Sequence, residues 1–162
     1  MNALKLLTND HRKHEELLQA GNIRKNYDEL REELIRHVHI EEEIFYPRLF
    51  EIPELKEAVA LALEEHTICM QLLQELDDQE LSETARSAKL KILTELLLSH
   101  EAKEEKELFP LVSELASHEY LNEVGTQMRI QKEETDPEEV LYPDPDEEKF
   151  YTKVRTNQPS SP

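Results

Sequence analysis

The chain has 162 residues, which is enough for one domain with a substantial buried core. Two glycines, no tryptophan and many Leu, Glu and Lys residues predict an all-α fold. The formal net charge of −18 argues against nucleic acid and anionic membranes as partners. A single cysteine excludes a disulfide framework within the chain. Because neither a signal peptide nor a run of transmembrane length is evident, we expect a cytoplasmic protein.

Apolar residues spaced three and four apart predict four long amphipathic helices. We expect them at about residues 2–20, 26–50, 54–77 and 83–116. The dipeptide Gly21-Asn22 should end the first helix, and Pro110 should kink the fourth or remove a hydrogen bond from it. Since the connections between neighbouring helices are short, the expected architecture is an antiparallel up-down-up-down four-helix bundle.

The C-terminal part of the chain has a different composition. A short helix is expected at about residues 118–132, and residues 133–148 then contain nine acidic and no basic residues. We therefore divide the chain into a bundle, residues 1–132, and an acidic, Pro-rich tail, residues 133–162. The tail is expected to be mobile unless aromatic side chains dock it, the candidates being Tyr142, Phe150 and Tyr151.

One short pattern occurs twice, in the second and fourth of these helices. Residues 37–47 (HVHIEEEIFYP) align with residues 100–110 (HEAKEEKELFP) as His-x-x-x-Glu-Glu, with a proline ten positions after the histidine. Residues four apart share one face of a helix, so each copy directs an imidazole and a carboxylate toward the same point. Such pairs suit iron, manganese or zinc, and two pairs indicate two metal ions.

The first and third helices each place a histidine, preceded by an acidic residue, on the inward-facing stripe. Counted from the hairpin turns, each of these histidines lies level with the histidine of the motif that follows it. The two motif glutamates occupy positions where leucine would be expected, and a buried carboxylate costs several kcal/mol unless a cation compensates. The sequence therefore predicts a buried metal site formed by His11, His37, Glu41, His66, His100 and Glu104.

The order of these residues resembles the hemerythrin-like (HHE cation-binding) family over about residues 3–130. Ferritin-like di-iron bundles place the glutamate three residues before the histidine, whereas here the histidine comes first and the glutamate follows at four. The resemblance implies a non-haem di-iron centre with an oxo, hydroxo or water bridge, in which manganese or zinc could substitute. It also implies two histidine pairs, one per iron, and two bridging carboxylates: His11 with His37, His66 with His100, and Glu41 with Glu104.

One departure from the family bears on function. Met70 occupies the position, four residues after His66, at which oxygen-carrying hemerythrins have a fifth histidine. The more open coordination is similar to relatives associated with iron sensing or with repair of iron centres under stress. We therefore expect a di-iron protein that senses or reacts with O2, NO or peroxide, with enzymatic turnover left open. The alternatives are reversible oxygen binding or storage, and an interaction bundle that metal only stabilises.

Several polar residues near the motifs keep more than one interpretation. His14 shares the inward stripe and is expected to hydrogen-bond a ligand, with direct ligation or a core role as alternatives. Glu101 is a candidate terminal ligand. Glu42 and Glu105, which follow the motif glutamates, are either surface residues or partners of ligands. Cys69 is most simply a small core residue, with a redox role as the alternative.

Overall fold

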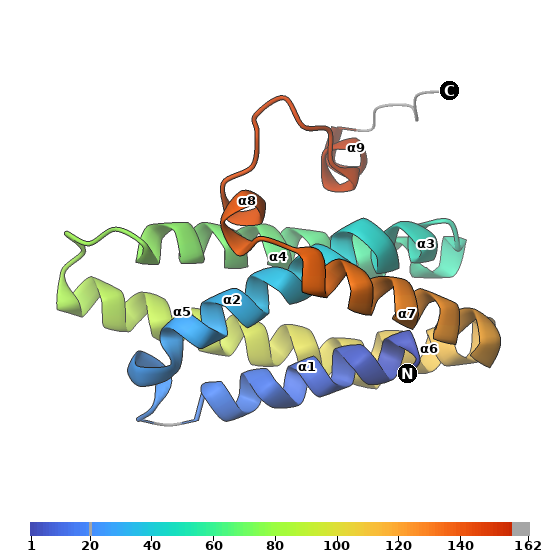
Figure 1. Ribbon diagram of the computed structural model, residues 1–162, viewed down its shortest axis with the longest axis horizontal. Helices are drawn as coiled ribbons and strands as arrows, with labels where there is room; N and C mark the ends of the chain where they lie inside the picture. Colours follow the sequence, from blue (N-terminus) through green and yellow to red (C-terminus); the bar gives the residue numbers. More distant parts are fainter. Residues whose placement is uncertain (20, 157–162) are drawn as a thin grey trace.

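The computed structural model describes residues 1–19 and 21–156, and its regular elements in this part of the chain are all helical. The bundle consists of α1 (Ala3–Leu17), α2 (Ile23–Ile40) continued by η1 (Glu41–Phe45) and α3 (Tyr46–Phe50), η2 (Pro53–Leu55) leading into α4 (Lys56–Leu76), and α5 (Glu83–Lys103) continued by η3 (Glu104–Leu108) and α6 (Phe109–Leu115). These four rods alternate in direction, and the α1–α2 and α4–α5 turns lie at the same end (Figure 1). The predicted all-α bundle is confirmed. Among the described residues, no helix combines the length and hydrophobicity needed to cross a bilayer.

Local sequence signals set where the helices begin and end. The side chains of Asn2 and Ser82 each accept a hydrogen bond from the backbone N–H three residues later, which caps α1 and α5. Gly21 lies in the turn after α1 with φ of +83°, a conformation that L side chains rarely adopt. The first helix therefore ends near Gly21, as predicted, because the chain turns there through a backbone conformation that favours glycine.

The bundle interior contains two apolar clusters. One, toward the α3 and α6 end, includes Leu7, Leu63 and Val112. The other, toward the α1–α2 and α4–α5 turns, includes Leu34 and Leu73. Between them each rod contributes histidines or glutamates, so the core is interrupted by a polar layer at mid-bundle. Packing on both sides fixes the height at which these polar side chains meet.

After the four rods, the long helix α7 (His118–Glu134) returns along the bundle and packs on α1 and α2 (Figure 1). Ser117 caps it by accepting the N–H of Tyr120 at 3.1 Å. At Gly125 the backbone of α7 approaches the start of α1 so closely that a Cβ atom would lie 2.3 Å from the carbonyl oxygen of Met1. Glycine is therefore required here for close packing, and α7 covers the outer face of α1.

The tail packs on the bundle through two short helices, α8 (Pro137–Leu141) and α9 (Phe150–Thr156). Leu141 is buried, and the ring of Phe150 meets Phe50 edge to face at 5.5 Å between centroids. The hydroxyls of Tyr142 and Tyr151 donate to Asp77 and Glu64, at 2.7 Å and 3.0 Å. Of the two possibilities left open by the sequence, docking by these aromatic residues is the one observed. The domain boundary at residue 132 stays a prediction, and residues 157–162 lie outside the described part.

Candidate metal centre

The six residues predicted as ligands meet in the polar layer, and all are buried. They come from α1, α2, η1, α4, α5 and η3 in chain order. Their nitrogen and oxygen atoms form two groups, each lying within 4.8 Å: His11, His37, Glu41 and Glu104 in one, and Glu41, His66 and His100 in the other. The geometry thus pairs the histidines as the family resemblance implied, with Glu41 common to both groups.

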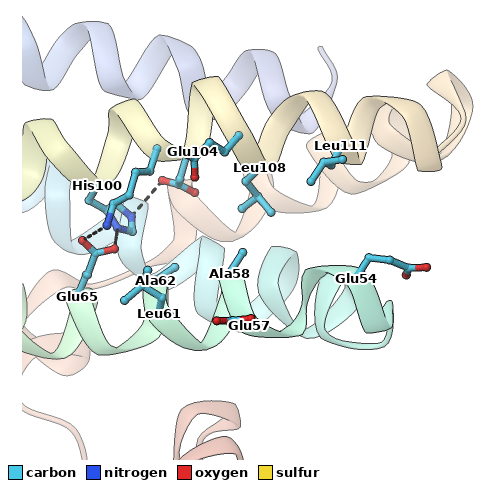
Figure 2. Close-up of a pocket in the computed structure, with 12 residues that line it drawn as sticks. Glu54, Glu57, Ala58, Leu61, Ala62, Glu65, His100, Glu104, Leu108 and Leu111 are labelled. Atoms are coloured by element: carbon cyan, nitrogen blue, oxygen red, sulfur yellow. Dashed lines mark hydrogen bonds and ion pairs between the residues drawn. The ribbon is translucent and has the colours of Figure 1, made fainter.

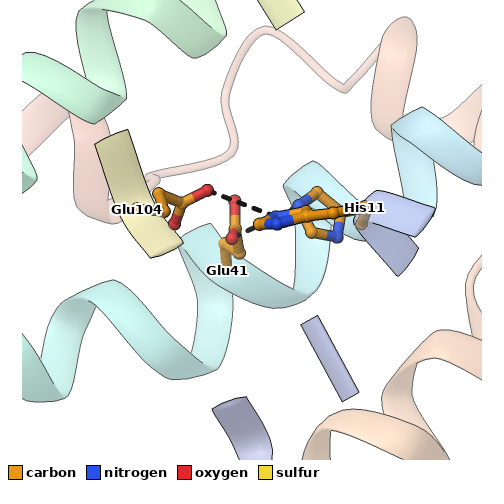
Figure 3. A group of neighbouring side chains, drawn as sticks. His11, Glu41 and Glu104 are labelled. Atoms are coloured by element: carbon orange, nitrogen blue, oxygen red, sulfur yellow. Dashed lines mark ion pairs between the residues drawn. The ribbon is translucent and has the colours of Figure 1, made fainter. Parts of the chain in front are cut away.

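Glu41 and Glu104 each lie near two histidines, one from each pair. The two oxygens of Glu41 face different histidines, His37 Nε2 at 3.3 Å and His66 Nε2 at 3.0 Å. Oε1 of Glu104 lies 3.6 Å from His11 Nε2 and 3.1 Å from His100 Nε2. Figure 3 shows His11, Glu41 and Glu104 facing one another across the bundle. A carboxylate placed between two groups of imidazoles has the geometry required to bridge two cations.

The nitrogen and oxygen atoms that face the centre of the layer are arranged as metal ligands and not as hydrogen-bond partners of one another. Four of them are buried without a hydrogen-bond partner among the described residues: His11 Nε2, His37 Nε2, Glu41 Oε1 and Glu104 Oε1. Buried polar atoms are normally paired, so this cluster of unpaired atoms needs a ligand. The Nε2 atoms of His66 and His100 lie 3.2 Å apart. Two imidazole nitrogens bound to one ion at about 2.0–2.1 Å lie about 3 Å apart, which matches this separation.

Each of the four histidines directs its other ring nitrogen to a carboxylate on a neighbouring helix. Two of these carboxylates immediately precede a histidine in sequence. Asp10 lies 3.1 Å from Nδ1 of His37, and Glu65 lies 3.4 Å from Nδ1 of His100. Asp10 is itself paired with Lys132, at 2.6 Å. The acidic residues of the Asp10-His11 and Glu65-His66 pairs therefore orient the histidine of the next helix.

The other two carboxylates follow the motif glutamates. Glu42 lies 3.0 Å from Nδ1 of His66, and Glu105 lies 2.7 Å from Nδ1 of His11. Both were left open in the sequence as surface residues or partners of ligands, and their contacts correspond to the second interpretation. A carboxylate on Nδ1 holds the ring orientation and makes Nε2 a better metal ligand. The duplicated sequence thus yields a duplicated set of four His–carboxylate pairs.

Both motif glutamates begin a π-helical turn, the wide turn closed by a hydrogen bond between residues five apart. In η1 the backbone N–H of Tyr46 bonds to the carbonyl of Glu41, immediately before Pro47. The second copy repeats this at Glu104, Phe109 and Pro110. The disturbance predicted near Pro110 therefore takes the form of a π-helical turn in both copies. Such turns are often found at functional sites.

Tyr46 is a member of the layer that the sequence did not identify. Its buried hydroxyl lies 3.1 Å from Oε2 of Glu41 and 3.1 Å from Oε2 of Glu104, and it donates to either. In an α-helix, residues five apart point about 140° away from each other, so Tyr46 was not expected beside Glu41. The π-helical turn brings them together. The only available signal was the mismatch between Tyr46 and its counterpart Phe109 in the repeat.

The structure also shows the surroundings of the other residues near the motifs. His14 and Glu101 pair with each other in the layer, through Nδ1 and Oε1 at 2.5 Å, and neither falls within the two ligand groups. Cys69 is buried in the second apolar cluster, and burial raises the pKa of its thiol to about 12, as expected for a core residue. Met70 is partly buried and lines a cavity beneath the tail. The second histidine of the first motif, His39, contacts α7 instead of the layer.

Without a cation, the layer balances its charge with protons. Burial, the largest single effect, would lower the pKa of His100, but the carboxylates of Glu104, Glu65 and Glu41 together outweigh it and raise that pKa to about 10. The pKa of His37 is likewise raised well above its usual value, since the carboxylates of Glu41 and Asp10 together outweigh burial. Burial would raise the pKa of Glu41, yet His37 and His66 together hold it well below its usual range. A metal ion that binds here must displace these protons, so binding and pH are linked.

Comparison with known proteins is consistent with this geometry. A family model described as the hemerythrin HHE cation binding domain matches residues 2–112, which include all six candidate ligands. The chain is similar to the crystal structure of a hemerythrin HHE cation binding domain-containing protein from Mycobacterium kansasii, with 25% sequence identity and a TM-score of 0.67. That similarity covers 83% of this chain and 86% of the other. A search of curated proteins finds no match.

Proposed function

The chain belongs to the hemerythrin HHE cation-binding family, and from this premise we propose that it holds two iron ions and uses them to sense or react with O2, NO or peroxide. The proposed ligands are two histidine pairs, His11 with His37 and His66 with His100, and two carboxylates, Glu41 and Glu104, that each lie near one histidine of each pair. The match to the family and the buried His/Glu cluster support cation binding. The choice of iron, the number of ions and the small-molecule partner are the proposal.

The observation that carries this proposal is the orientation of the four histidines. Their Nε2 atoms face the two central glutamates, while each Nδ1 faces a separate carboxylate. Ordinary core histidines do not require four supporting carboxylates in a bundle interior, because each such carboxylate costs desolvation free energy. A pair of cations balances the charges of the two central glutamates and gives the supporting carboxylates a role.

Bound iron would supply redox chemistry and coordination positions open to a small ligand. The protein's own residues hold and shield that site. The apolar clusters pack on both sides of the layer, and Tyr46 presents a hydroxyl proton between Glu41 and Glu104. Burial, followed by the two carboxylates, raises the pKa of Tyr46 well above its usual value, so the hydroxyl stays a donor at neutral pH.

The proposal is tested first by elemental analysis of protein purified without oxygen from iron-replete cells. We expect close to two iron ions per chain, because the ligands divide into two groups. One zinc ion per chain, or no metal after reconstitution with ferrous iron, would contradict a dinuclear iron site.

Reactivity separates the proposed role from oxygen storage. With only four histidines in the two ligand groups, we expect the reduced protein to be oxidised by O2 without a long-lived reversible form, and to bind NO. Stopped-flow absorption spectra measure both reactions. A stable spectrum that argon sparging reverses would instead indicate an oxygen carrier. A metal-loaded protein inert to O2, NO and peroxide would indicate a bundle that metal only stabilises.

A further inference from the structure

A groove of about 320 Å³ lies between α4 and the rod formed by α5, η3 and α6. Figure 2 shows it running along the two rods, from His100 and Glu104 at one end to Glu54 and Leu111 at the other. Both residues at the inner end are candidate ligands, and Oε1 of Glu104 is one of the buried atoms without a hydrogen-bond partner among the described residues. The groove therefore leads from the surface directly to the polar layer.

Of the four candidate histidines, His100 alone lines the groove, together with Glu104, which lies near one histidine of each pair. His100, which lines it, is 5% exposed, whereas His11 is fully buried. The ring of Phe109 stacks on His11 at 5.8 Å between centroids, and Nδ1 of His11 is hydrogen-bonded to Glu105. Helix α7 packs over α1 on that side. The two histidine pairs are therefore not equivalent: the groove reaches His100 of the His66–His100 pair, whereas His11 of the other pair is covered.

The residues that line the groove favour the entry of one chemical class of small molecule. Its walls are largely apolar and include Ala58, Ala62 and Leu108. Its outer part has the exposed carboxylates of Glu57 and Glu107. The one lysine in the lining, Lys103, is paired with Glu65, which leaves an excess of negative charge. Such an excess repels small anions, while a neutral molecule experiences no such barrier. Apolar walls also accommodate dissolved gases without a desolvation cost.

We propose that this groove is the access route for small neutral molecules such as O2 and NO to the His66–His100 half of the centre, and that its carboxylates exclude small anions. The inference rests on the proposed function for its metal and adds the route, the half of the centre that reacts and the charge selection. The ion pair between Glu65 and Lys103, at 2.8 Å, borders the inner end and keeps Glu65 beside Nδ1 of His100.

The first test compares the association rates of NO and azide with the iron-loaded protein by stopped-flow. Ala58→Trp places an indole in the groove and should slow NO binding at least about tenfold. Ala88→Trp is the matched control, because Ala88 is an exposed alanine of α5 that does not line the groove. The double substitution Glu57→Gln and Glu107→Gln should speed azide binding several-fold and leave NO unchanged. Wild-type NO rates in Ala58→Trp with full iron content would overturn the route.

The second test needs no metal. In metal-free protein, dissolved paramagnetic O2 should relax the methyl protons of Leu108 at least about threefold more than those of Leu17. These two leucines are 4% and 5% exposed, and of the two it is Leu108 that lines the groove. Equal relaxation would overturn the proposal even if the protein binds iron. Selective relaxation of Leu108 in a protein that binds no iron would instead support the route and contradict the proposed metal.

Discussion

Three consecutive glutamates at the start of η1 have three different environments. Glu41 is buried between two histidines, Glu42 supports Nδ1 of His66, and Glu43 is exposed. Single replacements by alanine should therefore have graded effects on iron affinity. We expect Glu41→Ala to abolish stoichiometric binding, Glu42→Ala to weaken it about 10- to 100-fold, and Glu43→Ala to leave it unchanged. Competition with a chromogenic chelator measures the series. Equal retention in all three variants would contradict the assignment of ligands.

Tyr46 makes a second prediction at this scale. Tyr46→Phe removes the hydroxyl that donates to the carboxylates of Glu41 and Glu104 but keeps the buried ring. We expect the fold to be retained and iron affinity to fall about tenfold, because the carboxylates lose the donor that orients them. Tyr142→Phe is a suitable control, since its hydroxyl also donates to a carboxylate but lies on the surface. Equal affinities for both variants would show that the Tyr46 hydroxyl does not hold the ligands.

At the scale of elements, the π-helical turns explain how one rod can present both a ligand and its hydrogen-bond donor. A regular α-helix directs residues four apart to one face, which accounts for His37 and Glu41. The wide turn that follows also brings Tyr46, five residues after Glu41, beside the Glu41 carboxylate. In the second copy, this position is Phe109, which stacks on His11. The repeat is therefore symmetric in its ligands and asymmetric in the aromatic residues beside them.

The tail should contribute to stability without contributing to the metal site. Leu141 is buried against the bundle, whereas all six candidate ligands lie between α1 and η3. Truncation after Glu134 is expected to lower the free energy of unfolding by about 2 kcal/mol or more, from loss of apolar burial, and to leave the iron content unchanged. Urea denaturation and elemental analysis measure the two effects.

Point variants separate the docking contact from other effects of truncation. Leu141→Ala should account for much of the lost stability, while Glu139→Ala, on the exposed side of α8, should change it little. If truncation removed iron as well, the division of the chain at residue 132 would be wrong in functional terms.

At the scale of the whole molecule, the polar layer couples stability to pH. The folded pKa of His100 is about 10, above its ordinary value of about 6.5, because the carboxylates of Glu104, Glu65 and Glu41 together outweigh burial. A raised pKa in the folded state contributes stability that is complete below the unfolded pKa and is lost as pH rises through the folded pKa. The metal-free protein should therefore lose stability between about pH 6.5 and 10.

Metal should remove this dependence, since cations take the place of the protons. Thermal unfolding across about pH 6–10, with and without iron, measures the difference. His100→Gln should reduce the slope of the profile of the metal-free protein, because one titrating group is removed while His37 remains. A flat profile for the metal-free wild-type protein would contradict the charge balance described for the layer.

The sequence alone determined the helical class, the four rods with their approximate ends and the six residues that converge. It did so because helical periodicity converts spacing in sequence into a shared face, and because a His-x-x-x-Glu pattern that occurs twice on apolar stripes is typical of metal ligation. Even the height at which the histidines meet followed from counting residues from the turns, since short connections force neighbouring rods to be antiparallel.

What only the tertiary structure decided depends on which rods are neighbours and on departures from ideal helix geometry. The carboxylate partner of each histidine comes from another rod, so spacing along one helix could not assign Asp10 to His37 or Glu105 to His11. Tyr46 reaches the layer only because a π-helical turn changes the phase of its helix. The docking of the tail and the one-sided groove arise from packing between segments far apart in sequence, where local periodicity carries no information.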